Sequence, residues 1–198
     1  MPSTDGERFA DAIVKIDAAN RDDPNREIVD GVAHAKEVLY SRRMSRWLQH
    51  LEPHASEALQ LAAHAQHIRR WTIPRSGYPM DRTGYHRWRL ALAKFHAETT
   101  AEILRRVGYD SAMIERVQAL IRKEKLKSDP EVQILEDVIC LVFLESYFAE
   151  FSTKHDAGKV IDILKKTWRK MSPRAHRVAL TLDLSPAART LVERALAS

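Results

Sequence analysis

The chain has 198 residues, of which 44% are hydrophobic and 30% charged, and its formal net charge is +5. These values are typical of a soluble protein with one domain and a full hydrophobic core. No apolar run is long enough to span a bilayer, so we expect no membrane partner. The positive charge permits a polyanionic partner without requiring one.

Apolar residues recur at helical spacing through most of the chain, and no alternating pattern of a strand is present. The sequence contains only six glycines. It therefore predicts an all-α fold, a single helical bundle of eight or nine helices covering roughly two-thirds or more of the residues. In chain order we place helices at about residues 5–19, 30–51, 55–71, 82–107, 110–125, 128–151 and 159–171, followed by two short helices opened by Ser172-Pro173 and Ser185-Pro186.

The segment ILEDVICLVFLESYF, residues 134–148, is the most apolar in the chain. Such a helix is apolar all round and should lie at the centre of the bundle. Cys140 in this segment is the only cysteine of the chain, which excludes an intrachain disulfide and favours a reducing, cytoplasmic location. The residues that we expect in the core are Cys140, Leu141, Phe143 and Leu144, with Leu61, Leu104 and Ile121 packed against them.

Histidines and aromatic residues are concentrated between His64 and His96, which hold four of the nine histidines and two of the four tryptophans. Pro74, Gly77 and Pro79 should separate two helices here. His64 and His67 are three residues apart, so they are predicted to share one helical face. The pattern indicates imidazoles on both helices and cations between them.

Imidazole and carboxylate groups from three helices could converge on one site. Such groups are the usual protein ligands of Fe, Mn, Zn or Ni. The predicted ligands of a divalent metal are His64, His67, His96 and Asp137, and the predicted catalytic residues are His67, Glu136 and Asp137. The alternative is a network of arginine–carboxylate pairs that only ties the helices together.

Arginines and aromatic residues alternate between the two histidine-bearing helices. Guanidinium groups bind phosphate bidentately, and aromatic rings can stack on a base. The predicted substrate-binding residues are Gln66, Arg69, Arg70, Trp71, Arg75, Tyr78, Arg82, Tyr85, Trp88, Arg89, Lys123 and Lys125. The alternatives are a solvated basic face with aromatic anchors and, for the two lysines, a solvated helix end.

The order of these features resembles the HD superfamily of helical metal-dependent phosphohydrolases. LQLAAHAQHIRRW resembles the family's helix that ends in His-Asp, and LEDVICLV resembles the helix that supplies the final Asp. The likeness covers about residues 39–144, with additional C-terminal helices at 157–198. It assigns His96 and Asp137 as ligands, whereas Gln66-His67 replaces His-Asp and Tyr40-Ser41 replaces the first His. The resemblance thus implies a shifted site that uses His67, His96 and Asp137.

A second resemblance covers nearly the whole chain. The segments LYSRRM, QHIRRW, GYHRWR, LEDVICLVFLE and KTWRKMS are similar to those of an uncharacterised family of bacterial and fungal proteins. Some of its members are labelled glutamyl-tRNA synthetase. This resemblance implies no settled activity.

Three classes of function follow from these patterns. The first is a metal-dependent phosphohydrolase acting on a phosphorylated small molecule such as a nucleotide. The second is a metal-free module that binds an anionic metabolite. The third, a nucleic-acid binder, is disfavoured because acids are interspersed with the cations outside residues 64–96 and no recognition motif is present. An iron-dependent oxygenase is a variant of the first.

Overall fold

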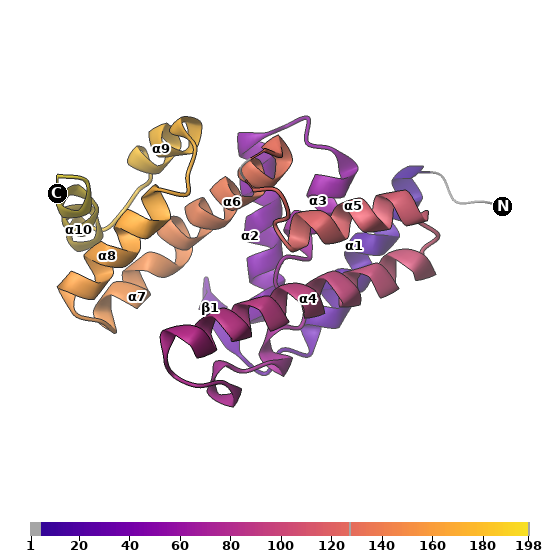
Figure 1. The fold of residues 1–198 in the computed structure, drawn as a ribbon, viewed down its shortest axis with the longest axis horizontal. Helices are drawn as coiled ribbons and strands as arrows, with labels where there is room; N and C mark the ends of the chain where they lie inside the picture. The colour runs from indigo at the N-terminus through magenta and orange to yellow at the C-terminus, as the bar shows by residue number, and fades with distance from the viewer. Residues whose placement is uncertain (1–4, 127, 198) are drawn as a thin grey trace.

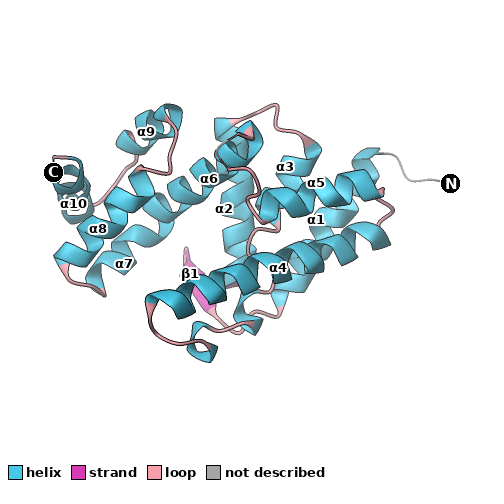
Figure 2. Cartoon of the chain, viewed as in Figure 1, coloured by secondary structure: helices cyan, strands magenta, loops and turns pink. Residues whose placement is uncertain are grey.

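The computed structural model describes residues 5–126 and 128–197 (Figure 1). It is 72% helical, with one small sheet (Figure 2). The α-helices are α1 Asp5–Arg21, α2 Lys36–Leu51, α3 Glu57–His64, α4 Arg82–Arg106, α5 Ser111–Ile121, α6 Pro130–Val142, α7 Phe148–Thr153, α8 Ala157–Trp168, α9 Pro173–Leu180 and α10 Pro186–Leu196. The all-α fold is confirmed, with ten helices in the described residues rather than the predicted eight or nine.

Polar side chains cap the N-termini of most of the described helices. The carboxylate of Asp110 accepts a hydrogen bond from Met113 N at 2.8 Å, and Asp81 caps α4 through Gly84 N at 2.6 Å. These bonds satisfy backbone N–H groups that have no partner within the helix. Beyond the end of α4, Gly108 has a φ of +89°, which is a conformation that glycine adopts without strain.

Two groups of helices are joined by α6 (Figure 1). In the first group α2 packs on α1, α3 and α6, while α5 packs on both α3 and α4. In the second group α10 packs on α8 and α7, and α9 packs on α6. None of the helices in the described part of the chain is long and apolar enough to cross a membrane.

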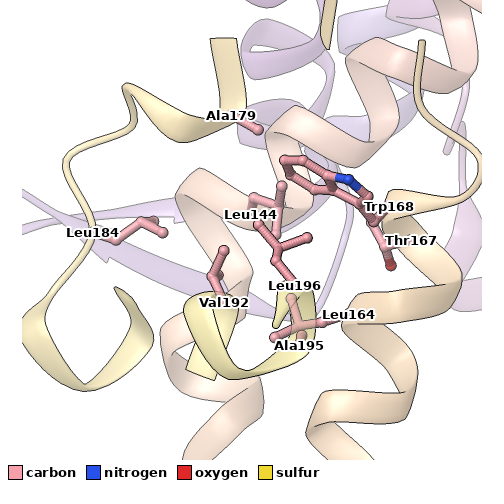
Figure 3. Close-up of a pocket in the computed structure, with 9 residues that line it drawn as sticks. All are labelled: Leu144, Leu164, Thr167, Trp168, Ala179, Leu184, Val192, Ala195 and Leu196. Atoms are coloured by element: carbon pink, nitrogen blue, oxygen red, sulfur yellow. The ribbon is translucent and has the colours of Figure 1, made fainter. Parts of the chain in front are cut away.

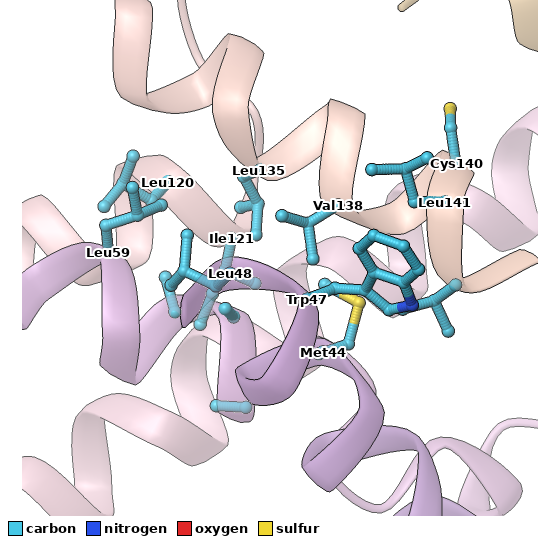
Figure 4. Close-up of a cluster of buried hydrophobic side chains, with 14 of the residues drawn as sticks. Met44, Trp47, Leu48, Leu59, Leu120, Ile121, Leu135, Val138, Cys140 and Leu141 are labelled. Carbon is cyan, nitrogen blue, oxygen red and sulfur yellow. The ribbon is translucent and has the colours of Figure 1, made fainter. Parts of the chain in front are cut away.

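The main hydrophobic core lies where α2, α3, α5 and α6 meet (Figure 4). Met44 and Leu48 of α2 face Leu135 and Leu141 of α6 there, and all four are almost fully buried. The core prediction is confirmed for Cys140, Leu141, Leu144, Leu61, Leu104 and Ile121, whereas Phe143 is only partly buried. The central position of the most apolar helix follows from its lack of a polar face.

A β-hairpin precedes α2, where the sequence analysis placed the first turn of a helix. Strands β1 (Arg26–Val29) and β2 (Val32–Ala35) pair antiparallel, with Val29 opposite Val32. The two turn residues, Asp30 and Gly31, both have positive φ, at 50° and 77°. This is the turn that Asp-Gly favours between short apolar runs, so the sequence carried a signal that helical spacing alone overlooks.

The third helix is also shorter than predicted. α3 ends at His64, and residues 65–69 form turns that lead into a short 3₁₀ helix, Arg70–Thr72. A second one, Arg75–Gly77, follows in the loop before α4. Arg69 has a φ of +49°, which reverses the chain just before Arg70. His64 and His67 therefore do not share a helical face.

The predicted sixth helix is interrupted by a π-helix, Phe143–Tyr147, between α6 and α7. In this turn the side chains of Glu145 and Tyr147 both reach α2. Glu145 accepts a hydrogen bond from the Trp47 indole at 2.8 Å, and the Tyr147 hydroxyl accepts one from Arg43 at 2.9 Å. Single π turns within α-helices are frequent at functional sites.

The burial of Cys140 predicts slow thiol chemistry in the folded protein. Burial raises the pKa of the thiol to about 12, so little of it is ionised at neutral pH, and a reagent cannot readily reach the sulfur. We expect Ellman's reagent to label the native protein more than about a hundredfold more slowly than protein unfolded in guanidinium chloride. A Cys140→Ser variant supplies the background. Equal rates in the two states would contradict the placement of α6.

Candidate functional site

Ionisable side chains from five segments meet beside α2, and we call this group the buried ionic cluster. Its members are Glu37 and Tyr40 of α2, His67 and Arg70 after α3, Arg89 and His96 of α4, Lys123 after α5, and Glu136 of α6. The positive charges of Arg70, Arg89 and Lys123 all lower the pKa of His67, so the members act on one another electrostatically. Burial is the largest influence on that pKa.

His67 lies at the centre of the cluster. Its ring stacks on Tyr40 with a centroid distance of 3.8 Å and an angle of 9°. Nδ1 lies 3.3 Å from Glu37 Oε2, without hydrogen-bond geometry, and Arg70 Nη1 lies 3.5 Å from Nε2. Because a guanidinium can only donate, Nε2 serves as the acceptor and the ring is neutral. Burial, Arg70 and His96 keep the pKa of His67 well below its usual value.

His96 is held in one tautomer by the backbone. Its Nδ1 donates to the carbonyl oxygen of Ile68 at 2.8 Å, so Nε2 carries the lone pair of a neutral ring. Nε2 is buried and has no hydrogen-bond partner in the described residues. Burial lowers the pKa of His96 to about 3, helped by the charges of Arg70 and Arg89. The rings of His67 and His96 are 6.0 Å apart.

Arg70 and Glu37 influence each other's ionisation through their charges. Burial raises the pKa of Glu37 to about 7, against the opposing charge of Arg70. Burial lowers the pKa of Arg70, whose guanidinium carbon lies 4.7 Å above the Trp88 ring. Near neutral pH, Glu37 is therefore only partly ionised, and it does not fully compensate the charge on Arg70.

Lys123 and Glu136 form an ion pair on the α6 side of the cluster. Lys170 Nζ lies 3.6 Å from the other oxygen of Glu136. Burial alone would raise the pKa of Glu136, but Lys123, Lys170 and Arg89 hold it below its usual value. Lys123 has a φ of +57°, a strained conformation for a non-glycine residue.

Asn20 near the end of α1 fixes the turn that carries Arg70. Its amide oxygen accepts a hydrogen bond from Arg69 N at 2.8 Å, and its amide nitrogen donates to Ser41 Oγ at 3.1 Å. Asn20 is fully buried. A tertiary contact therefore ends the helical run after α3, which explains why local sequence could not place this end.

The arginine-rich loop before α4 is closed by its own side chains. The Arg75 guanidinium donates to the carbonyl oxygens of Tyr78 at 3.0 Å and Pro79 at 2.6 Å. The Trp88 indole donates to Ile73 O at 2.9 Å. Arg75 and Trp88 thus shape the loop, and Arg70 is the loop residue that enters the cluster.

The remaining predicted substrate-binding residues lie mostly at the surface. Gln66 is buried, and Trp71 and Tyr78 are partly buried. Arg89 is exposed to solvent, and its positive charge lowers the pKa values of His67 and Glu136. The exposed members of the predicted set are Arg69, Arg82, Tyr85, Arg89 and Lys125.

Asp137 contacts the start of α9 rather than the histidines with which it was predicted to form a site. Its carboxylate accepts hydrogen bonds from Gln133 Nε2 at 2.9 Å, Ser172 N at 2.8 Å and Ser172 Oγ at 2.5 Å. It therefore ties α6 to the start of α9, and Glu136 is the carboxylate with cationic partners. Within residues 5–126 and 128–197, no three His, Cys, Asp or Glu side chains are placed to hold a metal ion. Of the residues that the HD resemblance implies, the structure brings His67 and His96 together and places Asp137 against Ser172.

His64, the fourth predicted metal ligand, belongs to different surroundings. Its Nε2 lies 3.0 Å from Asp17 Oδ1 of α1, and its Nδ1 lies 2.9 Å from Ser45 Oγ of α2. His67 instead contacts Tyr40 and Glu37. Because α3 ends at His64 and His67 lies in the turns that follow, the two imidazoles have different partners.

An apolar pocket lies between the C-terminal helices (Figure 3). Its lining residues are Leu144, Leu164, Thr167, Trp168, Ala179, Leu184, Val192, Ala195 and Leu196. Thr167 and Trp168 are its only lining residues with a polar side-chain atom, so the lining suits hydrophobic packing and supplies few groups for catalysis.

Comparison with known proteins identifies the family to which the chain belongs. A model of the family described as Domain of unknown function (DUF4202) matches residues 10–192. The chain belongs to this family. No curated protein and no solved structure gives a match. The family match spans all segments of the buried ionic cluster, whereas the HD resemblance and the glutamyl-tRNA synthetase label stay predictions.

Sequence reasoning missed Glu37, Asn20 and Lys170. A glutamate in the first turn of a helix ordinarily reads as a favourable partner of the helix dipole, so Glu37 gave no signal of burial. Asn20 and Lys170 lie far from His67 in sequence. Tyr40 was noted, but only as the residue in place of a histidine. Its spacing of three from Glu37 places both on one face of α2.

The hydrogen bonds of Asp137 predict a structural role. In an Asp137→Asn variant, the amide nitrogen cannot accept the bond from Ser172 or Gln133. We expect the free energy of unfolding to fall by about 1–3 kcal/mol. Urea denaturation measures it, with Asp162→Asn, an exposed position on α8, as the control. A loss no greater than that of the control would contradict this role.

The raised pKa of Glu37 predicts a pH-dependent stability. The carboxyl binds its proton more tightly in the folded than in the unfolded chain, so ionisation destabilises the fold as pH rises from 4.5 through about 7. Relative to Glu37→Gln, the native protein should lose up to about 3 kcal/mol between pH 4.5 and 8. Urea unfolding across this range tests it.

Glu98→Gln, at an exposed position paired with Lys94, is the matched control for this titration. It should follow the native protein across the whole range. Parallel curves for the native protein and Glu37→Gln would show that Glu37 does not titrate from a buried position.

Proposed function

We propose that the protein binds a phosphorylated small molecule at the buried ionic cluster, with the phosphate beside His67 and His96. The observation that carries the proposal is the incomplete pairing of Arg70. Its guanidinium is largely removed from water, yet it faces a neutral imidazole, an indole ring and a carboxyl with a pKa of about 7. A buried cation without a full counter-charge is costly, and a phosphate would supply that charge.

The charge balance of the cluster supports an anionic ligand. Its cations are Arg70, Arg89 and Lys123, with Lys170 beside them, and its carboxylates are Glu136 and the partly protonated Glu37. Guanidinium groups from two different segments offer paired donors that match phosphate oxygens. Neutral imidazoles can add further contacts without repelling the cations.

The two histidines give the binding a characteristic proton linkage. A dianion beside His67 and His96 would offset the desolvation and the cationic charges that lower their pKa values. Ligand binding should therefore be accompanied by proton uptake, and affinity should rise as pH falls from 8 towards 6. This linkage distinguishes the cluster from a surface patch of arginines.

Hydrolysis of a phosphate ester is the second candidate, favoured by the free lone pair on His96 Nε2. With a phosphate bound, this nitrogen could take a proton from a water that attacks phosphorus. His96→Gln would then abolish turnover of p-nitrophenyl phosphate and leave phosphate binding in place.

Isothermal titration calorimetry with inorganic phosphate, pyrophosphate and AMP tests the binding. We expect Arg70→Gln and Arg89→Gln to weaken the affinity for at least one of these ligands at least about tenfold. Measurements in HEPES and in Tris should reveal proton uptake from the difference in observed enthalpy. Arg105→Gln, at the exposed end of α4, is the matched control and should bind normally.

Two results would overturn the proposal. One is the absence of binding for all three ligands to a folded native protein. The other is an equal loss in Arg70→Gln and Arg105→Gln, because this would assign the affinity to general surface charge rather than to the cluster.

A further inference from the structure

A second polar site lies between α1, α2 and α3, apart from the buried ionic cluster. It borders a cleft of about 430 Å³, a volume suited to a small molecule. The lining residues are Phe9, Ile13, Arg42, Ser45, Arg46, Leu48, Gln49, Ala55, Gln60 and His64. The lining is therefore partly apolar, and it also carries two arginines, two glutamines, a serine and a histidine.

Ser45, His64 and Asp17 form a chain of hydrogen bonds at this cleft. Ser45 Oγ lies 2.9 Å from His64 Nδ1, and His64 Nε2 lies 3.0 Å from Asp17 Oδ1. The three residues come from three different helices, and the imidazole is almost completely buried. Ser45 and His64 both line the cleft.

The direction of these hydrogen bonds prepares the serine for reaction. A carboxylate only accepts, so Asp17 holds the proton on Nε2 and leaves the lone pair of Nδ1 facing the Ser45 hydroxyl. A serine is activated when a base can take its proton and a third group orients that base. The ring nitrogens have the opposite assignment to that of the serine proteases, but the same proton transfer is possible from either nitrogen.

We propose that Ser45, His64 and Asp17 form a nucleophilic centre that cleaves esters of small anionic molecules. Arg42 sets the preference for charge. Its side chain is 59% exposed, and its nearest carboxylate oxygen, on Asp17, lies 3.8 Å away, so the guanidinium can still receive an anionic group. Arg46 is already paired with Glu145. Phe9, Ile13 and Leu48 provide the apolar wall for the rest of the substrate.

The reaction proceeds in two balanced steps. Ser45 Oγ bonds to the carbonyl carbon while its proton passes to His64 Nδ1; the ester C–O bond then breaks, and the alcohol leaves with that proton. In the second step a water attacks the acyl-serine and gives its proton to His64. The carboxylic acid is released, and the proton returns to Ser45 Oγ. Asp17 stabilises the imidazolium in both steps.

A fluorophosphonate probe tests the centre, since it phosphonylates activated serines with loss of fluoride. Intact-mass and peptide mass spectrometry should find one adduct, on Ser45, and none in Ser45→Ala. His64→Gln and Asp17→Asn should slow labelling at least about tenfold. Ser152→Ala, on α7, is the matched control and should label like the native protein. The Arg70→Gln protein should also label normally, which separates this site from the phosphate site.

Arg42→Gln gives a test that does not depend on the fold of the buried variants, because the side chain is largely exposed. In this variant, hydrolysis of a succinyl ester of p-nitrophenol should fall relative to that of the acetyl ester, whereas Ser152→Ala should leave this ratio unchanged. Labelling of Ser45 no faster than in urea-unfolded protein would overturn the proposal. So would a His64→Gln protein that is folded by circular dichroism and labels at the native rate.

Discussion

Burial determines the protonation state of the central members of the buried ionic cluster. Burial keeps His67 and His96 neutral, raises the pKa of Glu37 and lowers that of Arg70. Each of these shifts favours the uncharged form of the group, so the cluster contains neutral hydrogen-bonding groups beside its charged ones. The segments that supply these groups are positioned by the core between α2, α3, α5 and α6. The hydrophobic packing thus sets the electrostatics of the site.

Most of the helices could be predicted because apolar spacing and polar caps coincide in the sequence. Asp81, Asp110 and the two Ser-Pro pairs mark helix starts that the structure retains. The errors arose where another interaction overrode the helical pattern. Asp30-Gly31 turns the chain into a hairpin, and the bond from Asn20 to Arg69 ends the run after α3. The second of these depends on a residue 49 positions away, which local spacing cannot reveal.

The candidate site was only partly predictable for a geometric reason. His67, His96 and Arg70 were expected to meet, and the structure brings them together. Glu136 and Asp137 are adjacent in α6, so their side chains differ by about 100° around the helix axis. Sequence alone could not decide which one pairs with the lysines and which one contacts α9. The choice follows from the position of Ser172, whose backbone and hydroxyl engage Asp137.

The π-helix at Phe143–Tyr147 constrains the length of the chain at this point. A π turn contains more residues per turn than an α-helix, and here it aims Glu145 and Tyr147 at α2 while α7 continues toward the C-terminal helices. Deleting one residue would restore a regular α-helix and change the directions in which Glu145 and Tyr147 point. Their hydrogen bonds with Trp47 and Arg43 of α2 would then be lost. Relatives should therefore vary in the identity of these five residues more readily than in their number.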